Sequence, residues 1–325
     1  MKWSITKSKM FSKCQRKWYY SEILANHKSK DPLRREAYLL KQLQSVYAWR
    51  GSLVDSIIQK LIVPRMRSKN LPSEDEVIDF SMKLMDKQLE FGKASKHRCP
   101  NVTKSNKKGE YCAFYDVEYN RGISDETLQE ARQDVLTALR NLIHSDFLRQ
   151  IMTDSTYVTA QRSLVFQFEN TTISCTPDLL TFFNAAPPLI VDWKVHSFSN
   201  AESWLQLGVY AVALSKIEPH KDFPEGIKPQ LGDPTNIRLV EYQLLKNKQR
   251  EYLVSPEDIA DIYDYIFTSC TEMNRLANGK KIHGSLDINQ FQTARSPKTC
   301  ETCQFKKPCW AKTPVQRPLF GVAWT

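Results

Sequence analysis

Two aspartates and a lysine in the middle of the chain have the types and spacing needed for metal-assisted cleavage of a phosphodiester bond. Asp178 follows a proline, and Asp192 and Lys194 lie two residues apart in the apolar run 189–195. Side chains two apart in a β-strand point to the same face of a sheet. Two carboxylates can hold a divalent cation that activates water and polarises the phosphate, while a lysine orients that water or offsets developing charge.

A β-hairpin is predicted to bring the two aspartates together. The segments 171–183 and 189–195 are rich in apolar and β-branched residues, and two consecutive prolines between them favour a turn. Pairing of these strands places Asp178 beside Asp192 at one end of a sheet.

An amphipathic helix is predicted directly after the hairpin. Residues 201–216 carry apolar side chains at helical spacing, and Ser199 or Asn200 is a suitable capping residue. Gln206 and Tyr210 are four residues apart, so they share one face of this helix.

This constellation resembles the PD-(D/E)xK nuclease superfamily, and within it the RecB-like branch with its Gln-x-x-x-Tyr helix. The residues that carry the resemblance are Pro177, Asp178, Asp192, Lys194, Gln206 and Tyr210. It implies a restriction-endonuclease-like α/β fold, with a mixed central β-sheet flanked by helices. It also implies that Asp178 and Asp192 bind Mg²⁺ or Mn²⁺, that the Trp193 carbonyl adds a ligand, and that Gln206 and Tyr210 face the active site.

An aspartate occupies the position of a further metal ligand of the RecB-like branch. That branch usually has a histidine a few residues after a glycine on an N-terminal helix, and the matching residues here are Gly51 and Asp55. Aspartate suits a hard cation, so the resemblance makes Asp55 a candidate ligand. The alternative is that Asp55 is an exposed helical residue and the site is weak or silent.

Four cysteines form a second candidate site. Cys300, Cys303 and Cys309 have the spacing C-x2-C-x5-C, and Cys14 lies near the other end of the sequence. Three thiols do not complete a four-thiolate site, so Cys14 is the natural fourth ligand. On spacing alone both zinc and an iron–sulfur cluster remain open.

The cysteine pattern is similar to that of RecB-like nucleases with an iron–sulfur cluster, such as CRISPR-associated nucleases and AddAB-type nuclease domains. The resemblance implies a structural [4Fe–4S] cluster that joins the two ends of the chain. Lys9, Arg16 and Lys17, which lie close to Cys14 in the sequence, are candidate phosphate contacts.

The remaining cysteines carry weaker indications of a function. Cys175 and Cys270 fall in apolar stretches and are expected in the core. Cys99 and Cys112 flank a basic loop near His97, where a second metal site is conceivable.

Composition agrees with a partner rich in phosphate. The 325 residues have a formal net charge of +10 and are 41% hydrophobic, which is typical of a basic globular protein. The N-terminus has no signal-peptide pattern and no apolar run has membrane length. We therefore expect a cytoplasmic protein without a membrane partner, in a reducing compartment that suits thiolate ligands.

The chain is expected to form three parts: a helical region over 1–155, a nuclease core over 156–254 and a cysteine-bearing region over 255–325. The predicted helices are 36–59, 73–91, 127–148 and 255–278, with a mobile basic loop or lid over 92–122. The predicted strands outside the hairpin are 157–168, 237–245 and 250–254.

These patterns predict a Mg²⁺- or Mn²⁺-dependent deoxyribonuclease with a structural [4Fe–4S] cluster. The resemblance implies exonuclease or end-processing activity, with single-stranded DNA or DNA ends as substrate. No Gly-rich phosphate loop is present, so a helicase would have to be a separate partner. Two alternatives are a weakly active or inactive DNA-binding scaffold of a helicase, recombination or defence complex, and a zinc-bearing nucleic-acid-binding protein.

Overall fold

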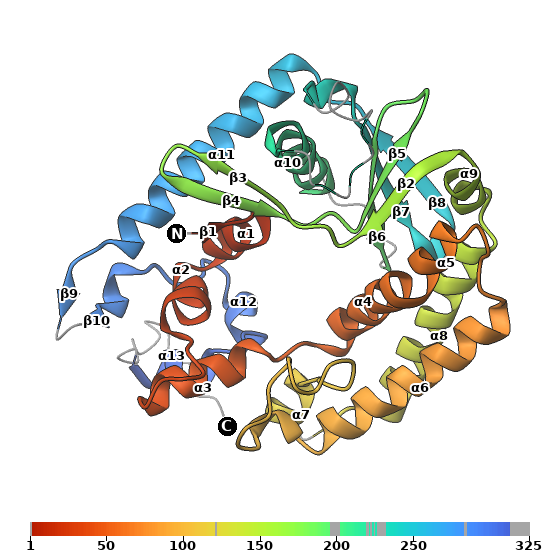
Figure 1. The fold of residues 1–325 in the computed structure, drawn as a ribbon. Coiled ribbons are helices and arrows are strands. Elements are labelled where there is room, and N and C mark those ends of the chain that lie inside the picture. The colour runs from red at the N-terminus through yellow and green to blue at the C-terminus, as the bar shows by residue number, and fades with distance from the viewer. Residues whose placement is uncertain are drawn as a thin grey trace. The chain divides into compact units, whose positions relative to one another are not determined.

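A computed structural model describes residues 2–120, 122–195, 202–218, 221, 223, 225, 232–282 and 285–312 (Figure 1). The chain divides into two compact units, one with Met1–Ile5 and Gln44–Glu272, the other with Thr6–Leu43 and Met273–Thr325. This division cuts across the three predicted parts 1–155, 156–254 and 255–325, because segments near the two ends of the chain fold together as one unit.

The first unit is built on a five-stranded mixed sheet with the strand order β2-β5-β6-β7-β8. Strands β6 and β7 are parallel, and the other neighbours are antiparallel. The inner strands are largely buried, which fits their continuous apolar sequences. The strands are β2 (Ser155–Ala160), β5 (Leu179–Phe183), β6 (Leu189–Lys194), β7 (Arg238–Gln243) and β8 (Lys248–Tyr252).

Two segments that were predicted as single strands divide between two sheets. The segment 157–168 contains the end of β2 and all of β3 (Leu164–Phe168), and 171–183 contains β4 (Thr171–Cys175) and β5. Strands β3 and β4 pair with β1 (Lys2–Trp3) in a separate sheet of order β1-β4-β3. The first break includes Gln161, which has a φ of 52°. The second contains Pro177, which lacks the N–H that a continuing strand would need.

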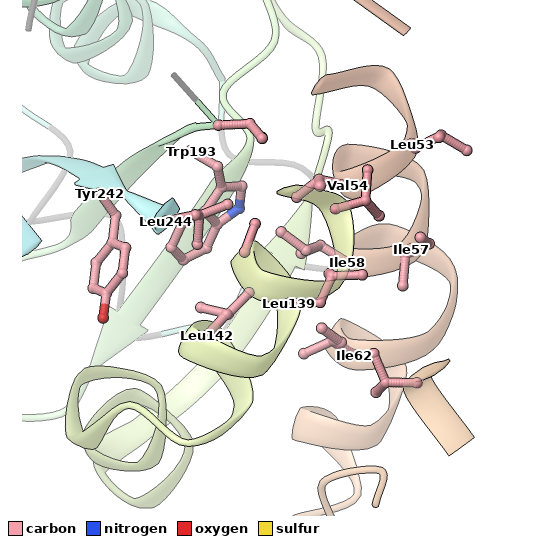
Figure 2. Packing of buried hydrophobic residues seen from close by; sticks show 14 of the residues in the cluster. Leu53, Val54, Ile57, Ile58, Ile62, Leu139, Leu142, Trp193, Tyr242 and Leu244 are labelled. Atoms are coloured by element: carbon pink, nitrogen blue, oxygen red, sulfur yellow. The ribbon is translucent and has the colours of Figure 1, made fainter. Parts of the chain in front are cut away.

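Helices of the first unit cover the sheet. They are α4 (Val46–Ile57), α5 (Val63–Arg67), α6 (Glu74–Lys93), α7 (Tyr115–Tyr119), α8 (Asp125–Ile143), α9 (Asp146–Asp154), α10 (Glu202–Lys216) and most of α11 (Pro256–Ala277), with the π-helix η2 (Ile58–Ile62) after α4. Apolar side chains of α4 and α8 pack with those of β6 and β7 in one core. Figure 2 shows Ile57, Ile58, Leu139, Leu142 and Trp193 in this core.

Two of the predicted helices are each two helices. The predicted helix 36–59 is wrong, because α3 (Pro32–Lys41) ends at residue 41 and Ser45 caps α4 by accepting a hydrogen bond from the Ala48 N–H at 3.2 Å. The predicted helix 127–148 is also two helices. Helix α8 ends at Ile143, and Ser145 caps α9 by accepting a hydrogen bond from the Leu148 N–H at 3.1 Å. The prediction for 73–91 matches α6 closely, and Ser73 and Glu76 form its capping box.

The predicted basic loop 92–122 is attached to the core at both ends. It begins at Gly92, where a Cβ atom would lie 2.4 Å from the Phe114 ring, so only glycine allows this close approach. Phe114 is buried and makes an edge contact with Trp49 of α4 at 5.3 Å between ring centroids. The segment also contains the short helices η3 (Lys96–Arg98) and α7, so it is more structured than a simple lid.

The second unit joins both ends of the chain around an aromatic core. Its elements are most of α1 (Ile5–Lys13), α2 (Gln15–Trp18), the π-helix η1 (Tyr19–Leu24), α3, the β9 (Lys281–Ile282) and β10 (Ser285–Leu286) pair, α12 (Pro297–Glu301) and α13 (Lys306–Lys312). The Tyr20 ring stacks on Phe305 at 5.5 Å, and the Tyr20 hydroxyl donates to the Pro308 carbonyl at 3.0 Å.

Across the described residues, no helix is both long enough and apolar enough to cross a membrane.

Candidate active site and cysteine pocket

The hairpin of β5 and β6 holds Asp178 beside Asp192. Leu179 pairs with Val191, so the two aspartates directly flank a pair of opposed residues at the same end of the hairpin. The Asp178 carboxylate accepts hydrogen bonds from the Gln161 side-chain amide at 2.9 Å and from the Trp193 backbone N–H at 3.0 Å. The orientation of Asp178 is therefore set by two neighbouring strands before any ligand binds.

Asp192 is contacted from its own strand and from α10. One carboxylate oxygen, Oδ2, lies 2.5 Å from the Lys194 Nζ, and Asp192 is only 2% exposed. The other oxygen, Oδ1, accepts a hydrogen bond from the Gln206 side-chain amide at 2.9 Å. The same amide donates to the Tyr210 hydroxyl at 2.9 Å, so the four-residue spacing on α10 links both residues to the aspartate.

Asp55 of α4 belongs to the same electrostatic group as the two strand aspartates. Burial, followed by the negative charge of Asp192, raises the pKa of Asp55 to about 7, although Lys194 opposes this. Burial raises the pKa of Asp178 well above its ordinary value, and the charges of Asp192 and Asp55 add to that effect. Three carboxylates lie in one place, and the raised pKa values of Asp55 and Asp178 reflect a repulsion between negative charges that a bound cation would relieve.

Lys194 keeps its charge in this setting. Burial disfavours the ammonium form, but Asp192, then Asp178 and Glu241, outweigh burial and raise the pKa of Lys194. A lysine held in its charged form cannot accept a proton at neutral pH. Its chemical role is therefore to orient a nucleophile or offset charge on the phosphate.

The structure adds two residues that sequence reasoning missed. Glu241 is fully buried on β7 in register with Asp192, where Gln243 donates to it at 2.8 Å. Burial would raise the pKa of Glu241, but hydrogen bonds from Ser203 and Gln243 outweigh it, so its pKa is lowered. The sequence does carry a signal for Glu241, because it is a lone carboxylate in an apolar strand. The role of Gln161 beside Asp178 has no local signal.

The donor set suits a hard divalent cation, although the side chains are not arranged around one. Carboxylate oxygens are the ligands that Mg²⁺ and Mn²⁺ prefer. Among the described residues, no group of three or more His, Cys, Asp or Glu side chains has the geometry to hold a metal ion. A cation at Asp192 would compete with the Lys194 ammonium for Oδ2. The backbone N–H of Trp193 points at Asp178, while its indole packs with Phe147 and Tyr242 in the core.

The four cysteines predicted as a cluster line one pocket in the second unit. The pocket has a volume of about 840 Å³ and its walls include Cys14, Cys300, Cys303 and Cys309. The Cys14 sulfur caps α2 by accepting from the Lys17 N–H at 3.4 Å, and the Cys303 sulfur accepts from the Phe305 N–H at 3.4 Å. All four are free thiols.

The thiols influence one another across this pocket. Burial, then the charges of Cys14 and Cys309, raises the pKa of Cys300. Burial also raises the pKa of Cys303, with Lys17 opposing and the same two cysteines adding to the rise. The four cysteines line a common pocket, but among the described residues they too form no group with metal-binding geometry. A bound metal would favour their thiolate forms.

The candidate phosphate contacts also lie in the second unit. Arg16 and Lys17 line the cysteine pocket, and the Arg16 Nε donates to the Phe291 carbonyl at 3.1 Å. Lys9 lies half-buried on α1.

The other cysteines do not form a second site in the part of the chain that the structure describes. Cys175 and Cys270 are buried, as predicted for core residues. Cys99 is exposed, whereas Cys112 is buried and accepts a hydrogen bond from Gln44 at 3.3 Å. His97 is buried as well, and these three residues form no metal-binding group.

Comparison with known proteins finds a family model and solved structures that align with most of the chain. The model of the PD-(D/E)XK nuclease superfamily matches residues 2–310. A solved structure of a "putative exonuclease" from Eubacterium rectale aligns over 98% of this chain and 90% of its own, at 10% identity and a TM-score of 0.45. The crystal structure of SSO0001 aligns over 72% of this chain and 98% of its own, at 14% identity and a TM-score of 0.31. Among curated proteins, the comparison finds no match.

The family match spans both units, and the combination of helices and mixed sheets is consistent with the restriction-endonuclease-like fold. The chain therefore belongs to the PD-(D/E)XK nuclease superfamily.

Proposed function

We propose that this protein is a Mg²⁺- or Mn²⁺-dependent deoxyribonuclease whose active site comprises Asp55, Asp178, Asp192 and Lys194. The observation that carries the proposal is the grouping of three carboxylates with raised pKa values at Asp55 and Asp178, next to a lysine that stays charged. Exonuclease or end-processing activity on single-stranded DNA is the mode that the resemblance to RecB-like nucleases implies.

Each residue has a separate task in this proposal. Asp55, Asp178 and Asp192 would hold the cation, with the Trp193 carbonyl as a further donor. The bound cation would supply Lewis acidity toward the phosphate and lower the pKa of an attacking water. Lys194 would orient that water or balance charge on the phosphate, and Gln206 with Tyr210 would keep Asp192 in place.

We further propose that Cys14, Cys300, Cys303 and Cys309 hold a structural [4Fe–4S] cluster. Support comes from the common pocket and from the fact that Cys14 precedes the long segment Gln44–Glu272 of the first unit, while the other three cysteines follow it. A cluster at this position would close the long loop between the ends of the chain and stabilise the second unit. Zinc in the same four ligands is the alternative.

A cleavage assay tests the nuclease proposal. Purified protein is incubated with labelled single-stranded DNA, duplex DNA and single-stranded RNA in Mg²⁺, Mn²⁺ or EDTA. Asp192→Asn and Lys194→Ala should each reduce DNA cleavage by roughly 100-fold or more, because both act on charge in the transition state. Asp79→Asn, at an exposed surface ion pair with Lys83, is the matched control and should cleave normally.

Two outcomes would reject the nuclease proposal. Metal-dependent cleavage that persists in Asp192→Asn would place the active site elsewhere. An absence of cleavage in the wild type, with DNA binding intact, would favour the scaffold alternative.

Metal analysis separates the two cluster hypotheses. Protein purified without oxygen should be brown and contain iron and sulfide in equal amounts that approach four per chain, as a [4Fe–4S] cluster requires. Colourless protein with one zinc and no iron would reject the cluster and leave the nuclease proposal untouched.

A further inference from the structure

One face of helix α4 is open to solvent and runs from its first turn to Asp55. The buried side chains of α4 include Trp49, Leu53 and Ile57, whereas Tyr47, Ala48 and Ser52 are exposed. Gly51 lies between Tyr47 and Asp55, and a Cβ atom there would meet nothing within 4 Å. Residues four apart follow one another along a helix face. The open face therefore runs from Tyr47, past Gly51, to Asp55 of the candidate active site.

Tyr47 is an exposed aromatic residue whose ring has a fixed neighbour. It is 62% exposed, and the Arg50 guanidinium lies 5.5 Å from the centroid of its ring. Arg50 is itself held by an ion pair with Asp134 of α8, and its side chain is only 11% exposed. A cation packed on an aromatic ring restrains the ring and strengthens the interaction when it is partly desolvated. Tyr47 is thus presented to solvent from a rigid support.

The position of Tyr47 matches the geometry of a nucleic-acid strand at the active site. Eight residues separate Tyr47 from Asp55, which corresponds to about 12 Å along a helix that rises about 1.5 Å per residue. Nucleotides of a stacked strand are spaced by roughly 3.4 Å. A strand with one phosphate at Asp55 can therefore place a base on Tyr47 within a few nucleotides.

A basic segment is attached near α4 on the side of the buried Trp49, and three of its basic side chains already pair with acidic residues. The segment 93–108 contains six lysine or arginine residues and no acidic residue. The chain that follows it packs against the first half of α4, since Phe114 contacts Trp49 and the Gln44 N–H donates to the Ala113 carbonyl at 2.9 Å. Exposed aromatic rings combined with basic side chains are the usual means of binding single strands without sequence preference.

We propose that Tyr47 is a base-stacking residue that positions single-stranded DNA on the Asp55–Asp178–Asp192 site, with Arg50 holding its ring. This inference rests on the proposed nuclease function and adds a residue on the α4 face that positions the single strand. In this arrangement Tyr47 contacts a base a few nucleotides away from the reacting phosphate, so it is a positioning residue.

Fluorescence of a base analogue tests the stacking directly. Asp192→Asn protein, which should bind without cleaving, is mixed with short single-stranded DNA that carries one 2-aminopurine at successive positions. We expect quenching at one position within a few nucleotides of the bound phosphate. Quenching at that position should be lost in Tyr47→Ala and retained in Tyr47→Trp. Phe267→Ala, which removes another exposed aromatic side chain from α11, is the matched control.

Cleavage by protein with an intact active site provides the second measurement. Tyr47→Ala should raise the KM for single-stranded DNA by roughly tenfold, within the range expected for loss of one stacked base, and leave kcat nearly unchanged. An abasic nucleotide at the quenched position should weaken binding to the wild type by a similar factor and have no further effect on Tyr47→Ala.

The outcomes separate this inference from the nuclease proposal. Unchanged quenching and KM in Tyr47→Ala would reject the stacking role, even if cleavage still depends on Asp192. An equal loss in Phe267→Ala would also reject it, because the effect would then not be specific to α4. Cleavage that does not depend on Asp192 would reject the nuclease site itself.

Discussion

Replacing Asp55 by asparagine removes one charge from the carboxylate group and keeps the size of the side chain. The pKa of Asp55 is raised from 3.8 to about 7 by burial and by Asp192. As pH rises through this window, the unfolded chain loses the Asp55 proton while the folded chain retains it. The free energy of unfolding of the metal-free wild type must therefore fall between about pH 4 and pH 7.

The size of this fall in the free energy of unfolding follows from the change in the pKa of Asp55. About three pKa units correspond to about 4 kcal/mol at 1.36 kcal/mol per unit. Asp55 is partly exposed and interacts electrostatically with the neighbouring aspartates, so solvent screening and coupling reduce the effect to about 2 kcal/mol. Asp55→Asn should match the wild type near pH 4. Above pH 7 it should be more stable, by about 4 to 8 °C in the melting temperature of a unit of this size.

Thermal unfolding in EDTA, measured at several pH values, provides the test. Addition of Mg²⁺ or Mn²⁺ at high pH should stabilise the wild type and stabilise Asp55→Asn much less, because the cation binds only the folded site. Asp79→Asn should show neither effect, since Asp79 is exposed and its ion pair with Lys83 contributes little. If Asp55→Asn and wild type keep the same difference in stability from acid to alkaline pH, Asp55 does not share charge with the strand aspartates.

Three further variants test contacts around the two sites. Gln206→Ala removes the amide that contacts Asp192 and Tyr210, and it should weaken Mn²⁺ binding or cleavage by roughly 10- to 100-fold. An unchanged Mn²⁺ affinity and an unchanged cleavage rate would show that this amide is dispensable. Glu241→Gln removes an acidic neighbour that raises the pKa of Lys194, so the alkaline limb of the pH–rate profile should move to lower pH. An unchanged alkaline limb would contradict the assignment of that limb to Lys194. Cys14→Ser should lose iron and make the second unit more sensitive to protease. Cys175→Ser changes a buried strand residue outside the pocket and should retain iron. Equal iron content in the two variants would exclude Cys14 as a ligand.

Local patterns were sufficient for the elements that carry most of the candidate site. The apolar and β-branched segments 171–183 and 189–195, with two prolines between them, predicted the hairpin that sets Asp178 beside Asp192, because strand pairing of neighbouring segments depends on short-range sequence and a turn. The four-residue spacing of Gln206 and Tyr210 likewise predicted a shared face, and the Gln206 amide donates both to Asp192 and to the Tyr210 hydroxyl. The spacing of the cysteines predicted a four-ligand metal site; all four line one pocket, and their role as ligands stays a prediction.

Tertiary structure decided the rest. The breaks that divide 157–168 and 171–183 between two sheets depend on which distant strands pair, and β1 at the start of the chain pairs with β4. Glu241 joins the site only because β7 lies parallel to β6 in one particular register. Asp55 acquires its raised pKa from burial and from the charge of Asp192, which is more than a hundred residues away in the sequence. Residue types and spacing determine which chemistry is available, whereas burial and long-range packing determine which of those groups share a low-dielectric site and interact.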